Sequence, residues 1–424
     1  MRIERFQIQG FKSIRELAVE GLADINVFFG MNDVGKSNMF QALELWHWLL
    51  SNAQSPTQTF TTDQIKEMQH RFGASLFQLG GRNAIHIAVD LSLGRAYMFA
   101  QPVDQHVAAQ VEAHFDYLQR DELRLTVQID LTHAAGGIVS CSIRKYWDGD
   151  TGFDLHPRDL AAFLTHFHII KANRRLKVEN RQDEFQSSPI TDRNLKQALF
   201  YAYLSSNIEQ KKRLNAIKRV LAEPPYSLGE LDIALDPATD RIDIGFVRPD
   251  GRLPIENLGS GAQQLILVLG QIFLNDYPII AVEEPETNLS PQHQEHLMAT
   301  LRTLMEDPAV KLQQLFVATH SPYLEFTDNF YDVTFDLTSG TQVQAATAEK
   351  YGKHFAITPA GPESGARLNS LNQVKLYEGV IQDLGLQRGD LVIFVRNEAG
   401  RWELRAANEV AQELQAVTNG NARP

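Results

Sequence analysis

The chain has 424 residues, of which 43% are hydrophobic and 22% are charged, a composition typical of a globular protein with a sizeable core. Its formal net charge of −12 argues against a surface that is basic throughout, although it allows a local basic stripe. The single cysteine, Cys141, excludes an internal disulfide, and no apolar run approaches the ~20 residues of a membrane helix. We therefore expect a cytoplasmic protein that does not associate with membranes and has two or three domains, or one domain with an insertion.

The first 50 residues predict strands, a glycine loop and a helix. Residues 1–29 alternate between polar and apolar or form a short apolar run, as strands do, and apolar residues within 37–50 recur at helical spacing. Between them lies the phosphate-loop pattern Gly30-x-x-x-x-Gly35-Lys36-Ser37. Backbone N–H groups and the helix N-terminus of such a loop face phosphate oxygens. We expect Lys36 to neutralise phosphate charge and Ser37 to bind magnesium, the alternative being a plain strand–turn–helix.

The region 59–225 has a different character. Stretches within 83–147 alternate like antiparallel strands, and residues 167–176 read as a strand that ends in basic residues. Residues 194–225 form a long helical stretch that ends at two prolines. We interpret the whole region as an inserted sheet with a helical arm that is too short for an extended coiled coil.

From residue 226 onward strands and helices alternate again. A hairpin is predicted around Pro249-Asp250-Gly251, and residues 262–274 form a buried helix. Two continuous apolar runs, within 277–286 and 312–322, suit a parallel sheet that is covered on both faces. The remaining chain predicts a helix near 371–384 and a hairpin in 390–406.

Acids and a histidine follow the two apolar strands. Glu283 and Glu284 come at the end of the first strand, and the ends of such strands bind ligands in open α/β sheets. We expect Glu283 to hold magnesium and Glu284 to orient or deprotonate an attacking water. His320, at the end of the second strand, could bond a γ-phosphate or that water. Each residue considered alone has a simpler interpretation: Glu283 and Glu284 could be solvated loop acids, and His320 could have only a structural role.

A second phosphate-seeking loop precedes the helix at 262–274. Gly259, Ser260 and Gly261 precede a second helix whose N-terminal backbone N–H groups could bind an anion, but no lysine follows them. The loop therefore cannot duplicate the first one. A glycine-rich turn with Ser260 as an ordinary N-cap is the alternative interpretation.

The order and register of four segments resemble those of the ABC-type ATPase heads of SMC, RecF and OLD-like proteins, which are often called AAA ATPases. The segments are RIERFQIQGFKSI…DINVFFGMNDVGKSN, LGSGAQQL, AVEEPETNLSP and ATHSP. The resemblance implies an α/β P-loop NTPase fold with a mixed sheet. The head would comprise 1–58 and 226–345. The inserted β-plus-helical arm region would be 59–225, and a small C-terminal accessory region would be 346–424, with no Toprim nuclease domain.

The resemblance also implies the ligands and the residues that bind them. ATP would be held by Asn32, Asp33, Val34, Gly35, Lys36, Ser37 and Asn38. Glu284 and His320 would be the catalytic residues. Ser37, Glu283 and a glutamine would bind magnesium. Gln78 is the candidate for that glutamine, and the alternative is that Gln78 is a surface residue before a hairpin. In such families two heads trap nucleotide between them. The signature residues Ser260, Gly261 and Gln263 of one head would cap the γ-phosphate held by its partner.

Three functions fit this resemblance. In the first, a homodimer or higher homo-oligomer with ATP-sandwiched heads senses DNA or an invader signal and controls a separate effector, a nuclease or toxin, in bacterial anti-phage defence. The second is a RecF-like repair ATPase that acts on DNA junctions. The third is a scaffold that clamps ATP with little turnover. Basic stretches within 171–181 and 211–219 are candidate contacts for double-stranded DNA, or else solvated helix faces.

Overall fold

The computed structural model divides the chain into two compact units, residues 1–345 and residues 346–424. In the first unit it describes residues 1–73, 75–77, 83–99, 105–134, 137–147, 155–164, 167–172, 174–176, 179, 189–321, 324 and 329–345. In the second unit it describes four strands, at 366–368, 374–376, 392–396 and 402–406.

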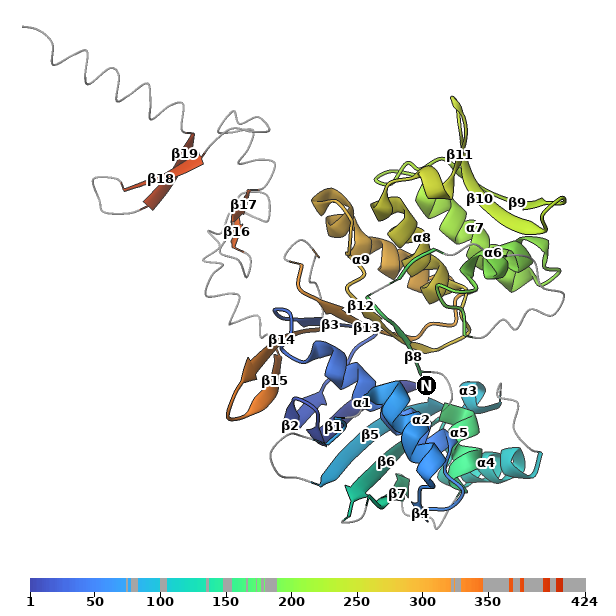
Figure 1. Cartoon of the computed structure of the whole chain (residues 1–424), viewed down its shortest axis with the longest axis vertical. Helices are drawn as coiled ribbons and strands as arrows, with labels where there is room; N and C mark the ends of the chain where they lie inside the picture. The colour runs from blue at the N-terminus through green and yellow to red at the C-terminus, as the bar shows by residue number, and fades with distance from the viewer. Residues whose placement is uncertain are drawn as a thin grey trace, which may run out of the picture. The chain divides into compact units, whose positions relative to one another are not determined.

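A mixed sheet of twelve described strands runs through the first unit in the order β4-β7-β6-β5-β1-β2-β15-β14-β3-β13-β12-β8 (Figure 1). Pairing is antiparallel from β4 to β14 and parallel from β14 to β8. The strands are β1 (Arg2–Phe11), β2 (Ile14–Glu20), β3 (Ile25–Phe29), β4 (Thr57–Thr59), β5 (Ala84–Gly94), β6 (Glu122–His133), β7 (Val139–Trp147), β8 (Phe167–Ile170), β12 (Ile279–Glu283), β13 (Gln314–Thr319), β14 (Asn329–Asp336) and β15 (Gly340–Ala345). The predicted mixed α/β sheet is confirmed.

The parallel strands bring the ends of three motifs to one edge. Every residue of β3, β12 and β13 is buried, as expected for apolar strands that are covered on both faces. Phe29 pairs with Thr319, and Glu283 pairs with Ala318. Because parallel strands in this register end together, the phosphate loop, the two glutamates and His320 all begin at the same edge.

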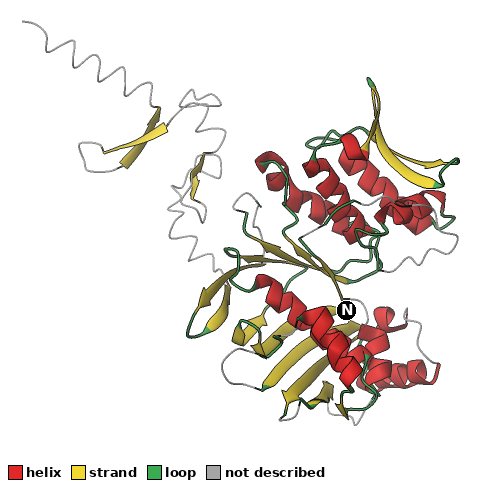
Figure 2. Ribbon diagram, in the orientation of Figure 1, coloured by secondary structure: helices red, strands yellow, loops and turns green. Residues whose placement is uncertain are grey.

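Helices lie on both sides of these parallel strands (Figure 2). Helix α1 (Lys36–Ser51) starts inside the phosphate loop and covers one side, and α8 (Ser260–Phe273) and α9 (Pro291–Met305) cover the other. The antiparallel part carries α2 (Thr62–Phe72), α3 (Arg95–Phe99), α4 (Gln105–Leu118) and α5 (Pro157–Leu164). None of the described helices is long and apolar enough to cross a membrane.

The helical stretch predicted for 194–225 is confirmed, and the structure divides it into two helices, α6 (Leu195–Leu204) and α7 (Ile208–Ala222). The break has a local cause. The Asn207 side chain accepts hydrogen bonds from the backbone N–H groups of Glu209 and Gln210, and such an N-cap starts a new helix. As predicted, α7 ends before Pro224 and Pro225.

The region predicted as an insertion shares its sheet with the segments predicted to form the head. Strands β5, β6 and β7 extend the sheet beyond β1, and β8 pairs in parallel with β12. A separate sheet contains β9 (Glu230–Asp236), β10 (Arg241–Arg248) and β11 (Gly251–Pro254), and a short 3-10 helix, Ile255–Asn257, follows it. The hairpin predicted at Pro249-Asp250-Gly251 is confirmed by the pairing of Arg248 with Gly251.

The described part of the second unit consists of two strand pairs, β16 (Ala366–Leu368) with β17 (Val374–Leu376) and β18 (Val392–Arg396) with β19 (Trp402–Ala406). The second pair confirms the hairpin predicted in 390–406. The helix predicted near 371–384 is wrong at 374–376, which form β17, and the rest of that prediction lies outside the described residues.

Candidate nucleotide site

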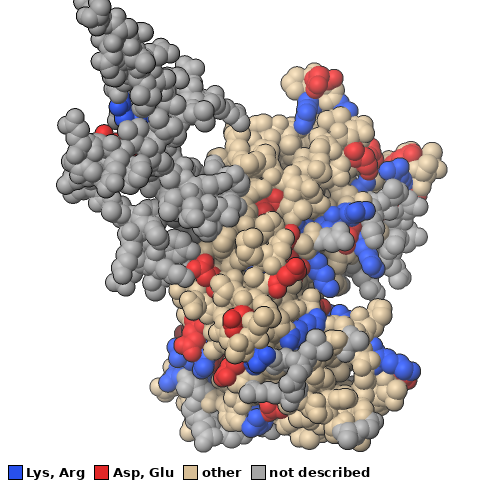
Figure 3. All heavy atoms as spheres, turned by 60° about the vertical axis from the view of Figure 1, so that its left-hand side comes forward, with Lys and Arg blue, Asp and Glu red and all other residues tan. Residues whose placement is uncertain are grey.

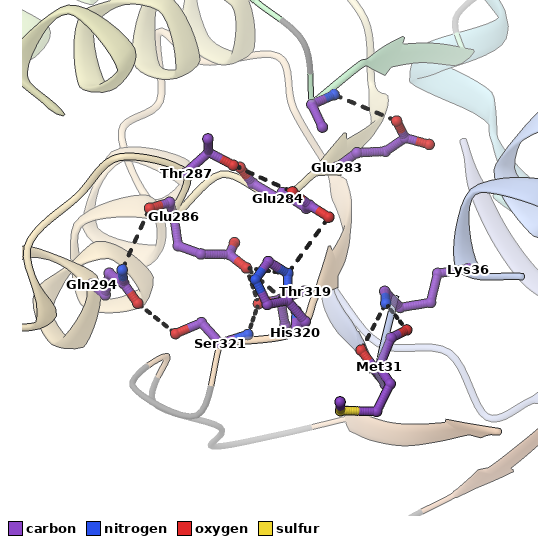
Figure 4. Close-up of polar contacts among 12 residues, drawn as sticks. Met31, Lys36, Glu283, Glu284, Glu286, Thr287, Gln294, Thr319, His320 and Ser321 are labelled. Atoms are coloured by element: carbon purple, nitrogen blue, oxygen red, sulfur yellow. Dashed lines mark hydrogen bonds and ion pairs between the residues drawn. The ribbon is translucent and has the colours of Figure 1, made fainter. Parts of the chain in front are cut away.

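The phosphate loop folds around its own lysine. The Lys36 side chain is buried, and its Nζ donates to the carbonyl oxygens of Gly30 at 2.7 Å and Met31 at 2.8 Å (Figure 4). Burial lowers the pKa of Lys36, and the carboxylates of Glu284, Glu286, Asp33 and Glu283 oppose that effect. Asn32 and Asp33 are exposed, and Val34, Gly35, Ser37 and Asn38 are half-buried. The lysine therefore lies in the field of the acids that end β12.

Two residues that sequence reasoning did not single out brace this loop. Thr341, at the start of β15, donates its hydroxyl to the Val34 carbonyl at 2.9 Å and lies 2.8 Å from the Ser13 hydroxyl. Asn38 donates to the Ser13 hydroxyl at 2.8 Å. Gly35 has φ +99°, and a Cβ there would lie 2.2 Å from the Thr341 hydroxyl. The glycine is needed both for its backbone angle and for this close approach.

The two predicted glutamates lie at the end of β12 in different environments. Glu283 is buried, and its carboxylate accepts from the Ala172 N–H at 3.4 Å. Glu284 has a left-handed backbone with φ +44°, and its carboxylate lies 3.5 Å from His320 Nδ1. Such a backbone is unusual for a residue other than glycine, and strain of this kind concentrates at functional sites. The Thr287 hydroxyl donates to the Glu284 carbonyl at 2.9 Å, which closes the turn.

A third acid, Glu286, completes the cluster around His320. Glu286 is only 3% exposed and accepts from the Thr319 hydroxyl at 2.5 Å and from the His320 N–H at 3.3 Å. His320 Nδ1 lies 3.7 Å from the same Glu286 oxygen and thus near both Glu284 and Glu286 (Figure 4). Burial raises the pKa of Glu286. The acid two residues after Glu284 was visible in the sequence, but only the fold shows that it contacts the end of β13.

The second loop begins helix α8. Gly259 is the N-cap and Ser260 is the first helical residue, so the alternative of Ser260 as an ordinary N-cap is wrong. Ser260 is exposed, Gly261 is half-buried, and Gln263 donates to the Leu258 carbonyl at 3.0 Å. No side chain caps the α8 N-terminus, which leaves its backbone donors available to an anion.

Two of the cations predicted to contact DNA are buried instead. Arg174 is 3% exposed and donates to the carbonyl oxygens of Glu283 and Glu284, and Arg213 is 2% exposed and pairs with Asp276 at 2.8 Å. Neither guanidinium can reach a phosphate backbone. On the face drawn in Figure 3, blue and red side chains of the described residues are interspersed and form no single basic stripe.

Two of the three predicted magnesium ligands, Ser37 and Glu283, lie among the described residues. Ser37 and Glu283 supply a hydroxyl and a carboxylate, hard oxygen donors of the kind that magnesium prefers, and one Glu283 oxygen makes only a long bond of 3.4 Å. Gln78 lies outside the described residues. Among the described residues, no cluster of three or more histidines, cysteines and acids could hold a metal ion by itself. Bound magnesium would therefore need further oxygens from nucleotide or water.

Part of the chain is similar to known proteins. Residues 142–324 match the family model described as "AAA ATPase domain". An uncharacterized protein of Methanocaldococcus jannaschii is 25% identical over 134 residues, which cover 32% of this chain and 16% of that protein. The aligned stretch is thus a small part of that relative.

Three solved structures are similar at low identity. One, of an SmcHead bound to the C-winged helix domain of ScpA, is 16% identical, with 83% of this chain and 100% of that chain covered and a TM-score of 0.46. A Pyrococcus furiosus Smc head with an extended coiled coil, bound to the C-terminal domain of ScpA, is 14% identical, with 83% and 98% covered and a TM-score of 0.48. The SMC head domain from Thermotoga maritima is 13% identical, with 82% and 100% covered and a TM-score of 0.42.

The family match contains the α8 loop, the β12 glutamates and His320. The phosphate loop follows β3, which ends at the same sheet edge as β12 and β13. The match to the AAA ATPase domain spans residues 142–324, less than half of the 424 residues, and the phosphate loop lies outside it.

Proposed function

We propose that the chain binds ATP with Mg²⁺ at residues 32–38, hydrolyses it, and pairs two heads around the bound nucleotide. One observation carries this proposal: Lys36 lies within the field of the β12 carboxylates, and His320 lies beside Glu284 and Glu286. A lysine inside a glycine loop neutralises β- and γ-phosphate charge, and a carboxylate at a neighbouring strand end can activate water.

Each residue has a role that its position supports. When a triphosphate enters, Lys36 would exchange the carbonyls of Gly30 and Met31 for phosphate oxygens. Ser37 and Glu283 would hold Mg²⁺, which supplies charge neutralisation of the β- and γ-phosphates. Glu284 would accept a proton from the attacking water, and His320 Nδ1, 3.5 Å from its carboxylate, would hold that carboxylate in place.

The α8 loop supports pairing between two copies. Its N-terminus is uncapped, Ser260 is exposed, and no lysine follows to make the loop a complete phosphate site. In the proposed homodimer, Ser260, Gly261 and Gln263 of one copy cap the phosphate held by Lys36 of the other. A two-fold dimer of this kind contains two identical composite sites.

Mixing two inactive variants tests this arrangement directly. Lys36→Ala removes the phosphate lysine, and Ser260→Glu places a carboxylate where the partner's γ-phosphate would lie. Each variant alone should lose both sites of its homodimer. In a mixed dimer, the wild-type Lys36 of one copy meets the wild-type Ser260 of the other, so one site is intact. An equal mixture should regain roughly one quarter of wild-type phosphate release, since half of the randomly assorted dimers are mixed.

Regained activity on mixing supports composite sites. No gain, when both variants are folded and wild-type protein hydrolyses ATP, would contradict pairing through α8. Glu284→Gln is the companion variant. It should retain ATP, keep the heads paired in light scattering, and lower turnover by about 10²–10⁴-fold, as expected on loss of a general base. Unchanged turnover would favour the scaffold function.

We further propose that ATP-dependent pairing controls a separate effector protein, a nuclease or toxin, in bacterial defence against phage. Support for this role comes from the sequence resemblance to OLD-like ATPase heads. Purification from its native host with and without ATP, followed by identification of co-eluting proteins, tests it. The RecF-like alternative predicts ATPase stimulation by gapped DNA, and the burial of Arg174 and Arg213 reduces the charge available for such contacts.

A further inference from the structure

Arg174 lies in the segment that follows β8 and reaches the peptide bonds of both β12 glutamates. Its Nη1 donates to the Glu283 carbonyl at 2.8 Å and to the Lys171 carbonyl at 2.8 Å, and its Nη2 donates to the Glu284 carbonyl at 2.9 Å. Because β8 pairs in parallel with β12, this segment leaves the sheet at the same edge as the glutamates. The guanidinium therefore fixes the backbone from which Glu284 projects.

The same arginine also contacts the helix that carries the second loop. Arg174 Nε donates to the Gln264 side-chain oxygen at 3.4 Å, and the Gln264 amide donates back to the Arg174 carbonyl at 2.9 Å. Gln264 is buried and lies four residues, about one helical turn, after Ser260 on α8. The Arg174 side chain thus connects the end of β12 to the first turns of α8.

The chemistry of this contact favours an arginine over a lysine. Burial lowers the pKa of Arg174 to about 10, so the group remains a cation near neutral pH. Its partners are carbonyls and an amide rather than carboxylates, so the three nearby glutamates stay available for other roles. A planar guanidinium donates in several directions at once, whereas an ammonium is a point charge on a flexible stem.

We propose that Arg174 is a positioning residue that couples nucleotide binding at the β12 edge to the orientation of helix α8 within one subunit. Nucleotide that shifts the Glu283–Glu284 backbone would move the guanidinium, and Gln264 would carry that movement to the loop at Ser260. This inference rests on the ATP binding proposed above, but it does not require pairing of two heads.

The chain offers a matched control in Arg213. This arginine is equally buried, and it donates to the carbonyls of Ala309 and Asn275 and to the Asp276 carboxylate. Asn275 follows the C-terminal end of α8, so Arg213 anchors the end of the helix that is remote from the second loop. Lysine at either position removes a buried guanidinium that anchors α8, but only Arg174 contacts the β12 carbonyls.

The test measures hydrogen exchange of the α8 amides with and without ATP and Mg²⁺ in Arg174→Lys, Arg213→Lys and the parent protein. All three carry Ser260→Glu, which by the proposal cannot pair, so any ATP effect on α8 travels within one subunit. We expect ATP to slow exchange in residues 262–268 of the parent and of Arg213→Lys but not of Arg174→Lys. The ATP dissociation constant of Arg174→Lys should stay within about threefold of the parent value, since Arg174 makes no contact with the phosphate loop.

A second variant keeps the inference testable if Arg174→Lys does not fold. Gln264→Leu removes only the contact with α8 and leaves the bonds to the β12 carbonyls, and it too should abolish the ATP effect on exchange. In otherwise wild-type protein, either variant should lower kcat about tenfold with little change in KM. ATP-dependent protection of α8 that persists in both variants would overturn the coupling while leaving the proposed function intact. A parent protein that fails to bind ATP would overturn both.

Discussion

Replacement of Gly261 by alanine should destabilise the protein through one backbone contact. A Cβ at Gly261 would lie 2.6 Å from the Asn288 carbonyl oxygen. That oxygen belongs to the backbone of the turn between β12 and α9, where Asn288 has φ +64°, so it cannot move aside as a flexible side chain could. The turn or the start of α8 must shift by several tenths of an ångström to relieve the contact.

The expected size of the effect follows from two opposing contributions. Overpacking of a closely packed contact costs about 1–3 kcal/mol. Alanine restricts the unfolded chain more than glycine does, which returns about 0.4–1 kcal/mol. We therefore expect Gly261→Ala to lower the free energy of unfolding by about 1–2 kcal/mol.

Gly259 provides the matched control two residues earlier. Its φ of −58° is ordinary, and a Cβ there meets nothing within 4 Å. The entropic gain of alanine is offset by its poorer N-cap preference, so Gly259→Ala should change the stability by less than about 0.5 kcal/mol. Urea unfolding followed by tryptophan fluorescence measures both variants, since Trp46 and Trp48 are buried. Equal unfolding midpoints for the two variants would refute the proposed contact.

Two further predictions follow from the same site. Gly35→Ala should lower the free energy of unfolding by about 2–4 kcal/mol, because the φ of Gly35 is +99° and a Cβ there would meet the hydroxyls of Thr341 and Ser13. A calorimetric unfolding midpoint equal to that of the wild-type protein would contradict this prediction. Burial raises the pKa of Glu286 above its ordinary 4.5, so the folded protein keeps a proton that the unfolded chain has released. Wild-type stability should therefore fall relative to Glu286→Gln as pH rises above about 4.5, and urea midpoints that run parallel from about pH 4 to pH 7 would exclude it.

Local sequence patterns predicted much of the sheet and the nucleotide loop. The glycine–lysine–serine spacing, the alternation in β1 and the apolar runs of β12 and β13 each encode their own backbone geometry within a few residues. For this reason the sequence alone predicts that β12 and β13 end at one edge of the sheet. The break between the two helices in 194–225 leaves no signal in the apolar spacing, because Asn207 acts as a cap only when the chain turns there.

The sequence by itself determined which residues could bind phosphate, but the tertiary structure decided which charges face solvent. Arg174 and Arg213 read as free cations after a strand and within a helix, and both are buried against carbonyl oxygens from distant segments. No local pattern distinguishes Glu286 from other loop acids, yet it contacts Thr319 and His320 at the end of the neighbouring strand β13. A charged side chain can be buried only where distant segments supply its hydrogen-bond partners, and the hydrophobic periodicity of a local segment does not indicate those partners.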